Sequence, residues 1–221
     1  MAQVFTPTAN IVARASIVIT VTVLGVAALL GFTLYRSPLV TEVGIAKAQP
    51  IPFSHQRHVG ANGLDCRYCH TSVEHSAFAG IPPTETCMTC HSQILTEAPL
   101  LQPVHESWND DTPIEWARLH DLPDFTYFDH SIHVAKGIGC TTCHGPVDEM
   151  RLSWKAETFH MSWCLECHRE PEKFVRPLDK VYDTDWDEDQ GDFVQAVDGP
   201  RLVEQYDIKV AQLENCQVCH R

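Results

Sequence analysis

Residues 53–70 read "FSHQRHVGANGLDCRYCH", and the end of this stretch decides how the chain must fold. Cys66, Cys69 and His70 form a C-x-x-C-H box. In such a box the two thiols bind the vinyl groups of one haem, and the histidine reaches the iron as the proximal ligand. A domain that carries bulky macrocycles folds around them. We therefore expect a mostly α and irregular fold, with short helices at the boxes and long loops between them.

The box occurs five times and uses all ten cysteines of the chain. Structural zinc is the alternative, since C-x-x-C is also half of a zinc site, but zinc ribbons pair these units and five is an odd number. Adjacent C-x-x-C pairs are also poor disulfide staples. We predict five covalently bound haem c groups. The attachment residues are Cys66, Cys69, Cys87, Cys90, Cys140, Cys143, Cys164, Cys167, Cys216 and Cys219, and the proximal ligands are His70, His91, His144, His168 and His220.

The sequence repeats itself once. The segment Phe53–His58, which reads F-x-H-x-x-H, recurs as Phe128–His133 at an offset of 75. Two haem boxes follow each copy, at offsets of 74 and 77, and the fifth box stands alone at the C-terminal end. Internal repeats of this kind mark repeated structural units. The repeat predicts a class III-like arrangement of 2 + 2 + 1 haems.

Eight histidines lie outside the boxes, although five haems need at most five distal ligands. The two histidines of an H-x-x-H pair sit about one turn apart and can project towards different haems, as in the class III cytochromes c that these segments resemble. His75 and Met150 occupy corresponding places in the two halves, so if His75 completes the second haem, Met150 should complete the fourth. The alternative is that Met150 is a core residue and that His120 or His160 supplies this ligand. The distal candidates are His55, His58, His75, His130, His133 and Met150, with His120, Met161, His105 and His160 in reserve. The reserve residues also fit surface or core positions.

Residues 15–35 form an uncharged apolar run of 21 residues. At about 1.5 Å per residue a helix of this length spans roughly 30 Å, the thickness of a bilayer core. A cleaved signal peptide would have a shorter apolar region and a small-residue cleavage site. We predict a single-pass anchor in the lipid bilayer of the bacterial cytoplasmic membrane. Because haem c is attached outside the cytoplasm, the N-terminus should be inside and the haem domain periplasmic.

The formal net charge is −13, which disfavours nucleic acid as a partner because nucleic-acid binding needs a basic face. Acidic residues concentrate in residues 179–198. A calcium loop counted from Asp183 would place Glu188 at its sixth position, where the EF-hand requires glycine, and Val194 at its twelfth. A solvated acidic loop is the better interpretation.

The predicted organisation follows from these features. A short helix is expected in "DDTPIEWARLH", beginning at Asp111 or Thr112. The predicted parts are a cytoplasmic tail at 1–14, a transmembrane helix at 15–35, a linker at 36–52, a first dihaem module with its connector at 53–127, a second dihaem module at 128–178, and an acidic loop with the fifth haem at 179–221.

The apolar N-terminus, the two F-x-H-x-x-H units, "HMSWCLECHRE" and the terminal box together resemble the pentahaem cytochrome c subunit of alternative complex III, a bacterial quinol:acceptor oxidoreductase. The resemblance implies an integral-membrane partner subunit that binds and oxidises quinol, and a large extrinsic iron–sulfur subunit. It also implies that electrons leave to a monohaem cytochrome c, a copper protein or an oxidase. The chain itself would be an electron conduit with no catalytic residues, and not an enzyme on its own.

Two alternatives stay open on the sequence. One is an anchored multihaem quinol dehydrogenase of the nitrate and nitrite respiration kind, in which the first box usually follows the helix closely; here 30 residues separate Tyr35 from Cys66. The other is a multihaem enzyme that converts nitrite or hydroxylamine. Such an enzyme needs a haem with an open iron position, whereas all five boxes here are standard and spare histidines are plentiful.

Overall fold

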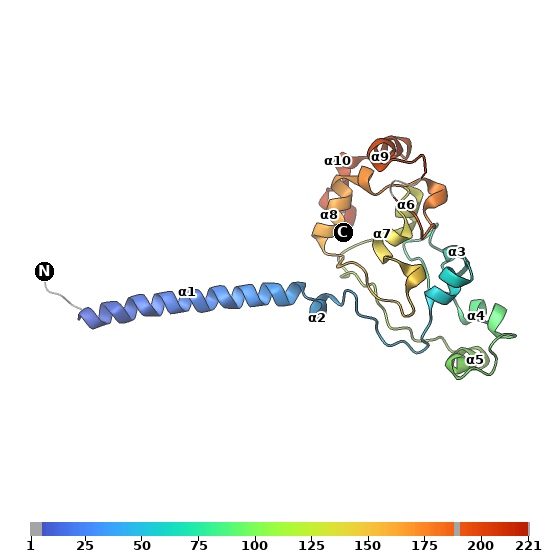
Figure 1. Cartoon of the computed structure of the whole chain (residues 1–221), viewed down its shortest axis with the longest axis horizontal. Helices are drawn as coiled ribbons and strands as arrows, with labels where there is room; N and C mark the ends of the chain where they lie inside the picture. The colour runs from blue at the N-terminus through green and yellow to red at the C-terminus, as the bar shows by residue number, and fades with distance from the viewer. Residues whose placement is uncertain (1–5, 188–190, 221) are drawn as a thin grey trace. The chain divides into compact units, whose positions relative to one another are not determined.

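The computed structural model describes residues 6–187 and 191–220, and the chain divides into two compact units, residues 1–42 and 43–221. In the first unit, helix α1 (Pro7–Arg36) is followed by the short helix α2 (Pro38–Thr41) (Figure 1). The Thr6 hydroxyl accepts a hydrogen bond from the Ala9 amide at 3.3 Å and caps α1, and Pro7 takes the first helical position. The apolar helix predicted for residues 15–35 is confirmed, and it extends beyond both predicted ends.

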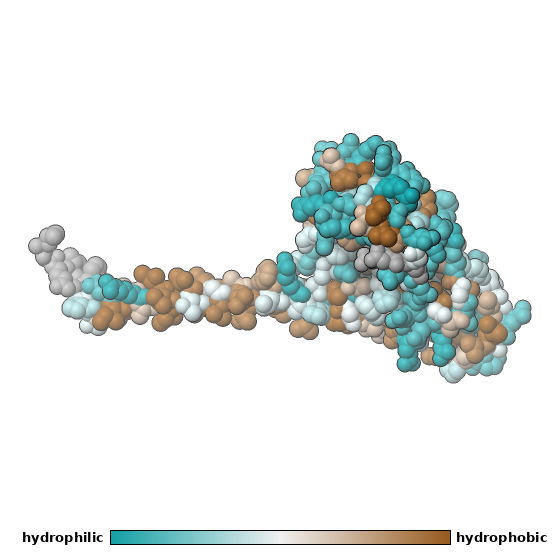
Figure 2. Space-filling view, turned by 45° about the horizontal axis from the view of Figure 1, so that its top comes forward, coloured by the Kyte–Doolittle hydropathy of each residue, from teal (hydrophilic) through white to brown (hydrophobic). Residues whose placement is uncertain are grey.

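Helix α1 has the length and composition of a membrane span. Its mean hydropathy reaches 2.5, and none of its residues is buried within the protein. Apolar side chains lie along its whole visible length in Figure 2. A signal sequence at an N-terminus passes the same test, so the membrane anchor stays a prediction.

The second unit consists of short helices joined by loops, which confirms the mostly α and irregular fold. Within residues 43–187 and 191–220 only three isolated β-bridges occur and no strand. The helices are η1 (Gln56–Ala61), α3 (Cys66–Cys69), α4 (Thr84–His91), η2 (Pro99–Leu101), α5 (Gln102–Asp110), α6 (His130–Ala135), α7 (Cys140–His144), η3 (Val147–Glu149), α8 (Met161–Arg169), η4 (Pro171–Lys173), η5 (Leu178–Lys180), α9 (Gln195–Gln205), α10 (Val210–Leu213) and α11 (Cys216–Cys219).

Each C-x-x-C-H box forms one helical turn. Helices α3, α7 and α11 begin at the first cysteine of a box, whereas α4 and α8 contain their boxes in their last turns. In the first box Asp65 caps α3, its carboxylate accepting the Arg67 amide at 2.8 Å. Because residues three apart lie on one face of a helix, the turn brings the two thiols of a box to the same side.

The polypeptide interior of the second unit is small. Seven apolar side chains count as buried among the described residues, and Val175 and Val181 are the largest fully buried ones. The two valines flank a segment that lies against the third box, where the Cys140 amide donates to the Val181 carbonyl oxygen at 3.2 Å. A unit with so few buried side chains agrees with the expectation that the macrocycles supply much of its core.

The helix predicted for residues 111–120 is wrong. The helix of this region, α5, lies earlier and ends at Asp110, and residues 112–118 are irregular. Asp111 adopts the left-handed conformation with φ 50°, and its amide donates to the Ser107 carbonyl oxygen, which terminates α5. Two predicted parts include residues that the structure does not describe: residues 1–5 of the tail at 1–14, and residues 188–190 and 221 of the part at 179–221.

Candidate haem site

The two F-x-H-x-x-H units have the same geometry, although the first lies on a π-helix, η1, and the second on an α-helix, α6. Phe53 stacks on His58 with ring centroids 4.4 Å apart, and Phe128 stacks on His133 at 4.4 Å. The first histidine of each unit meets the same phenylalanine edge-on, at 4.9 and 4.8 Å. The phenylalanine therefore fixes the orientation of both rings. The sequence repeat showed that the phenylalanine recurs, but not that its ring contacts both histidines.

Seven histidines make a hydrogen bond between Nδ1 and a backbone carbonyl oxygen, at 2.6–3.2 Å. They are His58 to Ser54, His70 to Gly80, His91 to Ile94, His130 to Ala77, His133 to Asp129, His168 to Leu213, and His220 to Phe125. A carbonyl oxygen can only accept, so Nδ1 must carry the proton. The lone pair is then on Nε2, which is the arrangement of a metal-ligating histidine with its outer nitrogen anchored to the protein.

Three pairs of histidine rings have the spacing that one metal ion between them requires. A metal–imidazole bond is about 2.0–2.1 Å and the ring centroid lies about 1.1 Å further, so two rings on opposite sides of one metal have centroids about 6.3 Å apart. Each observed pair joins a histidine of an F-x-H-x-x-H unit to the proximal histidine of a box. The pairs are His58 with His91 at 6.2 Å, His130 with His144 at 6.3 Å, and His133 with His168 at 6.3 Å.

His55 completes the pattern. Its pKa is lowered to about 4, mainly by burial and then by the neighbouring His70 and His58, so the ring lies close to the histidine of the first box. Its Nδ1 lies 2.9 Å from the Ser153 hydroxyl. The corresponding histidine of the second half, His130, faces the first box of that half. The residues at the second, third and fourth boxes therefore fit haem held between two imidazoles, and His55 is the candidate second imidazole at the first box.

His120 and His105 were held in reserve as ligands, and each has a buried Nε2 with no partner among the described residues. The His120 ring packs edge-on against His144 at 4.4 Å, and burial lowers the pKa of His120. Burial is also the main cause that lowers the pKa of His144 to about 3, with His120 and His130 adding to it. Both rings next to the third box are thus held neutral. His105 lies on α5, which packs against α4 and the second box.

The other predicted ligands are dispersed. His75 is exposed. Met150 is 4% exposed, and an added Cβ on Gly145, next to the third box, would meet its methyl group. Met161 is 61% exposed at the start of α8, directly after His160. The rings that face the histidines of the second and fourth boxes are those of His58 and His133.

The fifth box is attached to the segment that precedes the second repeat. Nδ1 of His220 bonds to the Phe125 carbonyl oxygen at 3.2 Å, the two rings stack at 5.9 Å, and the Tyr127 amide donates to the Cys219 carbonyl oxygen at 2.7 Å. Within the described part of the chain no second histidine ring is found facing His220. The proximal histidine of the fifth box is therefore held in place, whereas no ring contact identifies a distal ligand for this box.

Contacts between boxes show which of them are neighbours. The hydroxyl groups of Tyr68 in the first box and Thr89 in the second lie 2.8 Å apart. The thiols of Cys66 and Cys140, in the first and third boxes, are within hydrogen-bonding reach, and this contact raises the pKa of Cys140. The first box therefore lies between the second and the third.

The third, fourth and fifth boxes follow in the same way. His130 and His133 stand on the same helix, α6, and face the third and fourth boxes. Behind the fourth box, Nδ1 of His168 bonds to the Leu213 carbonyl oxygen at 3.1 Å, close to the start of the fifth box. In Figure 1, α4, α3, α7 and α8, which carry the second, first, third and fourth boxes, succeed one another across the second unit.

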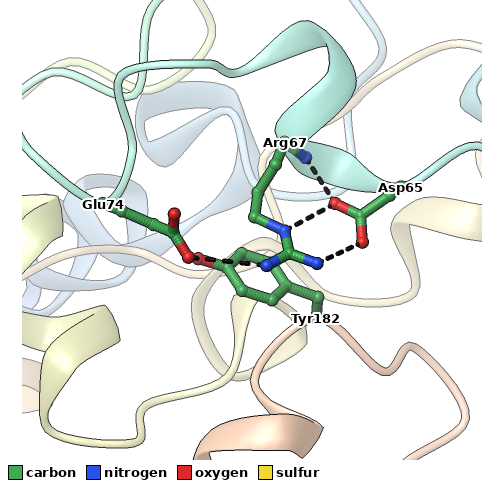
Figure 3. A network of polar contacts seen from close by, with 4 residues as sticks. All are labelled: Asp65, Arg67, Glu74 and Tyr182. Carbon is green, nitrogen blue, oxygen red and sulfur yellow. Dashed lines mark hydrogen bonds and ion pairs between the residues drawn. The ribbon is translucent and has the colours of Figure 1, made fainter.

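A polar network ties the first box to the segment that follows η5 (Figure 3). The Arg67 guanidinium bonds to both carboxylate oxygens of Asp65, at 2.9 and 2.8 Å, lies 3.6 Å from Glu74, and sits 4.3 Å from the centre of the Tyr182 ring. The Tyr182 hydroxyl donates to Glu74 at 2.9 Å. Val181, the preceding residue, accepts the amide of Cys140, so this segment holds the first and third boxes together. The sequence did not reveal this connection.

Comparison with known proteins agrees with this site. Residues 126–221 match the family described as cytochrome c7 and related cytochrome c. Over 99 residues the chain is 37% identical to the "Menaquinone reductase, multiheme cytochrome c subunit" of Nitratidesulfovibrio vulgaris. The aligned region covers 44% of this chain and 46% of the relative. The chain thus spans about half the length of that relative. Three boxes lie within residues 126–221, so this region is a multihaem cytochrome c with covalently bound haem c.

Proposed function

We propose that the chain is a membrane-anchored pentahaem cytochrome c that conducts electrons between a quinone-linked membrane partner and an extracytoplasmic acceptor. The observation that supports this most is the set of facing imidazole pairs at 6.2–6.3 Å. Two imidazoles on one iron leave no position for a substrate. The pairs therefore favour electron transfer over a nitrite- or hydroxylamine-converting enzyme.

Bound haem supplies a reversible one-electron couple at its iron. The residues of the chain would attach each haem, ligate its iron and orient the ligands. The thiols fix each macrocycle, the carbonyl-anchored histidines present a neutral Nε2, and Phe53 and Phe128 keep the distal rings from turning. Rigid ligation on both faces keeps the geometry similar in the oxidised and reduced states, which suits a conduit.

The ring geometry changes our assignment of the distal ligands. We assign His55, His58, His130 and His133 to the first, second, third and fourth haems. His75 and Met150 are then not needed at the second and fourth haems, and Met150 contributes to the core. For the fifth haem we now propose His160 or Met161, both held in reserve above, because they stand at the start of α8, whose Cys164 thiol has its pKa raised by burial and then by the neighbouring Cys219.

The contacts between boxes support a single row of haems in the order second, first, third, fourth, fifth. Exposure of the thiols agrees with this order. Cys90 and Cys216 are the exposed cysteines, and they belong to the second and fifth boxes, the two ends of the row. Electrons would enter at one of these ends and leave at the other.

The partners are inferred from the resemblance described above. They are an integral-membrane subunit that oxidises quinol, an extrinsic iron–sulfur subunit, and a monohaem cytochrome c or copper protein as acceptor, with α1 in the bilayer. The similar protein of Nitratidesulfovibrio vulgaris carries the name of a menaquinone reductase subunit, so the second candidate is electron flow in the opposite direction, towards quinone.

The complex purified from detergent-solubilised membranes tests both directions. Reduction of the haems by added quinol, in the complex but not in the isolated chain, is expected for the first candidate. Oxidation of pre-reduced haems by added quinone would instead establish the second. Quinol oxidation by the isolated chain would contradict the conduit and favour the quinol dehydrogenase. A five-coordinate haem that binds nitrite would favour the enzyme.

A further inference from the structure

Arg176 is a buried cation that lies against the turn of the third box. Its side chain is 6% exposed, and its guanidinium donates to the hydroxyl oxygens of Thr141 and Thr142 at 3.3 and 3.2 Å. Both threonines lie between Cys140 and Cys143 in the sequence. The guanidinium also lies so close to Gly139 that a Cβ at that position would collide with it.

The backbone around Arg176 holds the charge in place. Its amide donates to the Gly137 carbonyl oxygen at 2.8 Å, and the neighbouring residues Ile138 and Val175 form an antiparallel bridge. The Tyr206 hydroxyl donates to the Arg176 carbonyl oxygen at 3.3 Å. Arg176 therefore has little freedom to move its guanidinium away from the box.

The charge of Arg176 is poorly compensated. Its third acceptor is the backbone carbonyl oxygen of Asp183 at 3.3 Å, and its Nε is buried without an acceptor. The Asp183 carboxylate pairs with Lys180 at 3.1 Å, and the described ion pairs include no carboxylate bound to Arg176. The centre of the Trp186 ring lies 5.6 Å from the guanidinium carbon. A buried charge is only weakly screened by solvent and salt.

We propose that Arg176 raises the reduction potential of the haem at the third box. When a one-electron donor reduces that haem, the iron gains one electron and its charge falls by one. A fixed positive charge beside the box stabilises this reduced state relative to the oxidised state. This inference rests on the proposed function. It makes the haem in the middle of the row, between the first and the fourth, a site where an electron is held more strongly.

Redox titration of the full-length protein with mediator dyes tests the proposal. In Arg176→Gln we expect the ratio of oxidised to reduced haem, at the wild-type midpoint, to rise about tenfold for one haem of the five, which corresponds to about 59 mV. Arg176→Lys keeps the charge and should retain most of the wild-type midpoint. The matched control is Arg169→Gln, an arginine that directly follows the fourth box but is 57% exposed and paired with Glu214. It should leave all midpoints unchanged.

Haem content, measured on the same samples, separates the possible failures. A wild-type chain without five haems refutes the proposed function. The role of the charge is overturned if the Arg176→Gln protein carries five haems and its midpoints are unchanged. It is also overturned if the midpoint of one haem shifts equally in the Gln and Lys variants. If neither Arg176 variant retains haem, Gly139→Ala replaces them, because the added Cβ would displace the Arg176 guanidinium from the box while the charge stays in the chain. It should lower one midpoint, and an unchanged set in a five-haem protein would also overturn the proposal.

Discussion

Replacing His133 by alanine should open the iron of one haem and leave the other four unchanged. The His133 ring faces His168 at 6.3 Å, is anchored through Nδ1 to the Asp129 carbonyl oxygen at 2.7 Å, and stacks on Phe128. With five boxes in the chain, loss of one imidazole converts one iron in five from six- to five-coordinate. The low-spin signal should therefore fall by the share of one haem.

Electron paramagnetic resonance of the oxidised protein measures the high-spin fraction, and carbon monoxide titration of the reduced protein counts open irons. We expect no carbon monoxide bound at the first four haems of the wild type and one additional molecule per chain in His133→Ala. His58→Ala should behave in the same way, because its ring faces His91 in the equivalent arrangement. His133→Met should restore low spin and raise one potential, since thioether favours ferrous iron.

Ile132→Ala is the matched control. Ile132 lies on the same helix between the two histidines, and its side chain is 57% exposed. The spin state and haem content should not change in this variant. A His133→Ala protein that carries five haems and stays fully low-spin would refute the ring-pair assignment and return Met150 to consideration at the fourth haem.

Three further outcomes are expected. Deleting residues 1–36 should release a soluble haem protein with an unchanged spectrum that is no longer reduced by quinol, as measured by stopped-flow absorbance. Arg67→Gln should cost at most about 1 kcal/mol in urea unfolding, because the pair with Asp65 is exposed. The hydrogen bond from Arg67 lowers the pKa of Asp65 below its ordinary 3.8. The stability gained from this pair is therefore fully present at neutral pH and is lost as the pH falls from 3.8 through the lowered pKa of the folded protein. Finally, Cys216→Ser should leave a protease-resistant protein, whereas Cys140→Ser, next to the buried core, should lose resistance to limited proteolysis.

The sequence predicted those parts of the molecule that depend on local pattern. A C-x-x-C-H box needs only one helical turn, so α3, α7 and α11 could be located from their cysteines. Helix α1 followed from one uninterrupted apolar run, because helix length and hydropathy are both local quantities. The repeat of Phe53–His58 at Phe128–His133 was also readable, and the identical ring geometry of the two copies shows why the phenylalanine recurs.

Contacts between distant segments could not be predicted. The carbonyl partners of His168 and His220 lie 45 and 95 residues away, at Leu213 and Phe125, and no local pattern indicates such pairings. The proposal for Met150 came from aligning it with His75, but that alignment compares chain positions, whereas the choice of ligand depends on which ring faces the iron. The helix expected at residues 111–120 failed because Asp111 takes a left-handed conformation and ends α5.

The proposed haem row is not in chain order, and the contacts between the boxes give a physical reason. In the second half, His130 and His133 of one turn face the histidines of both boxes, so the two proposed haems there must be neighbours. We infer the same for the first half, where His58 faces His91. The halves then meet through their first boxes, where Cys66 lies beside Cys140 and the Val181–Tyr182 segment contacts both. A junction between first boxes puts the second haem at one end, and the fourth haem on the far side next to the fifth. A junction through the second box would instead place the second haem inside the row and the first haem at its end. In the proposed row the contacts at this junction, more than the distance along the chain, therefore determine which two haems can face partner proteins.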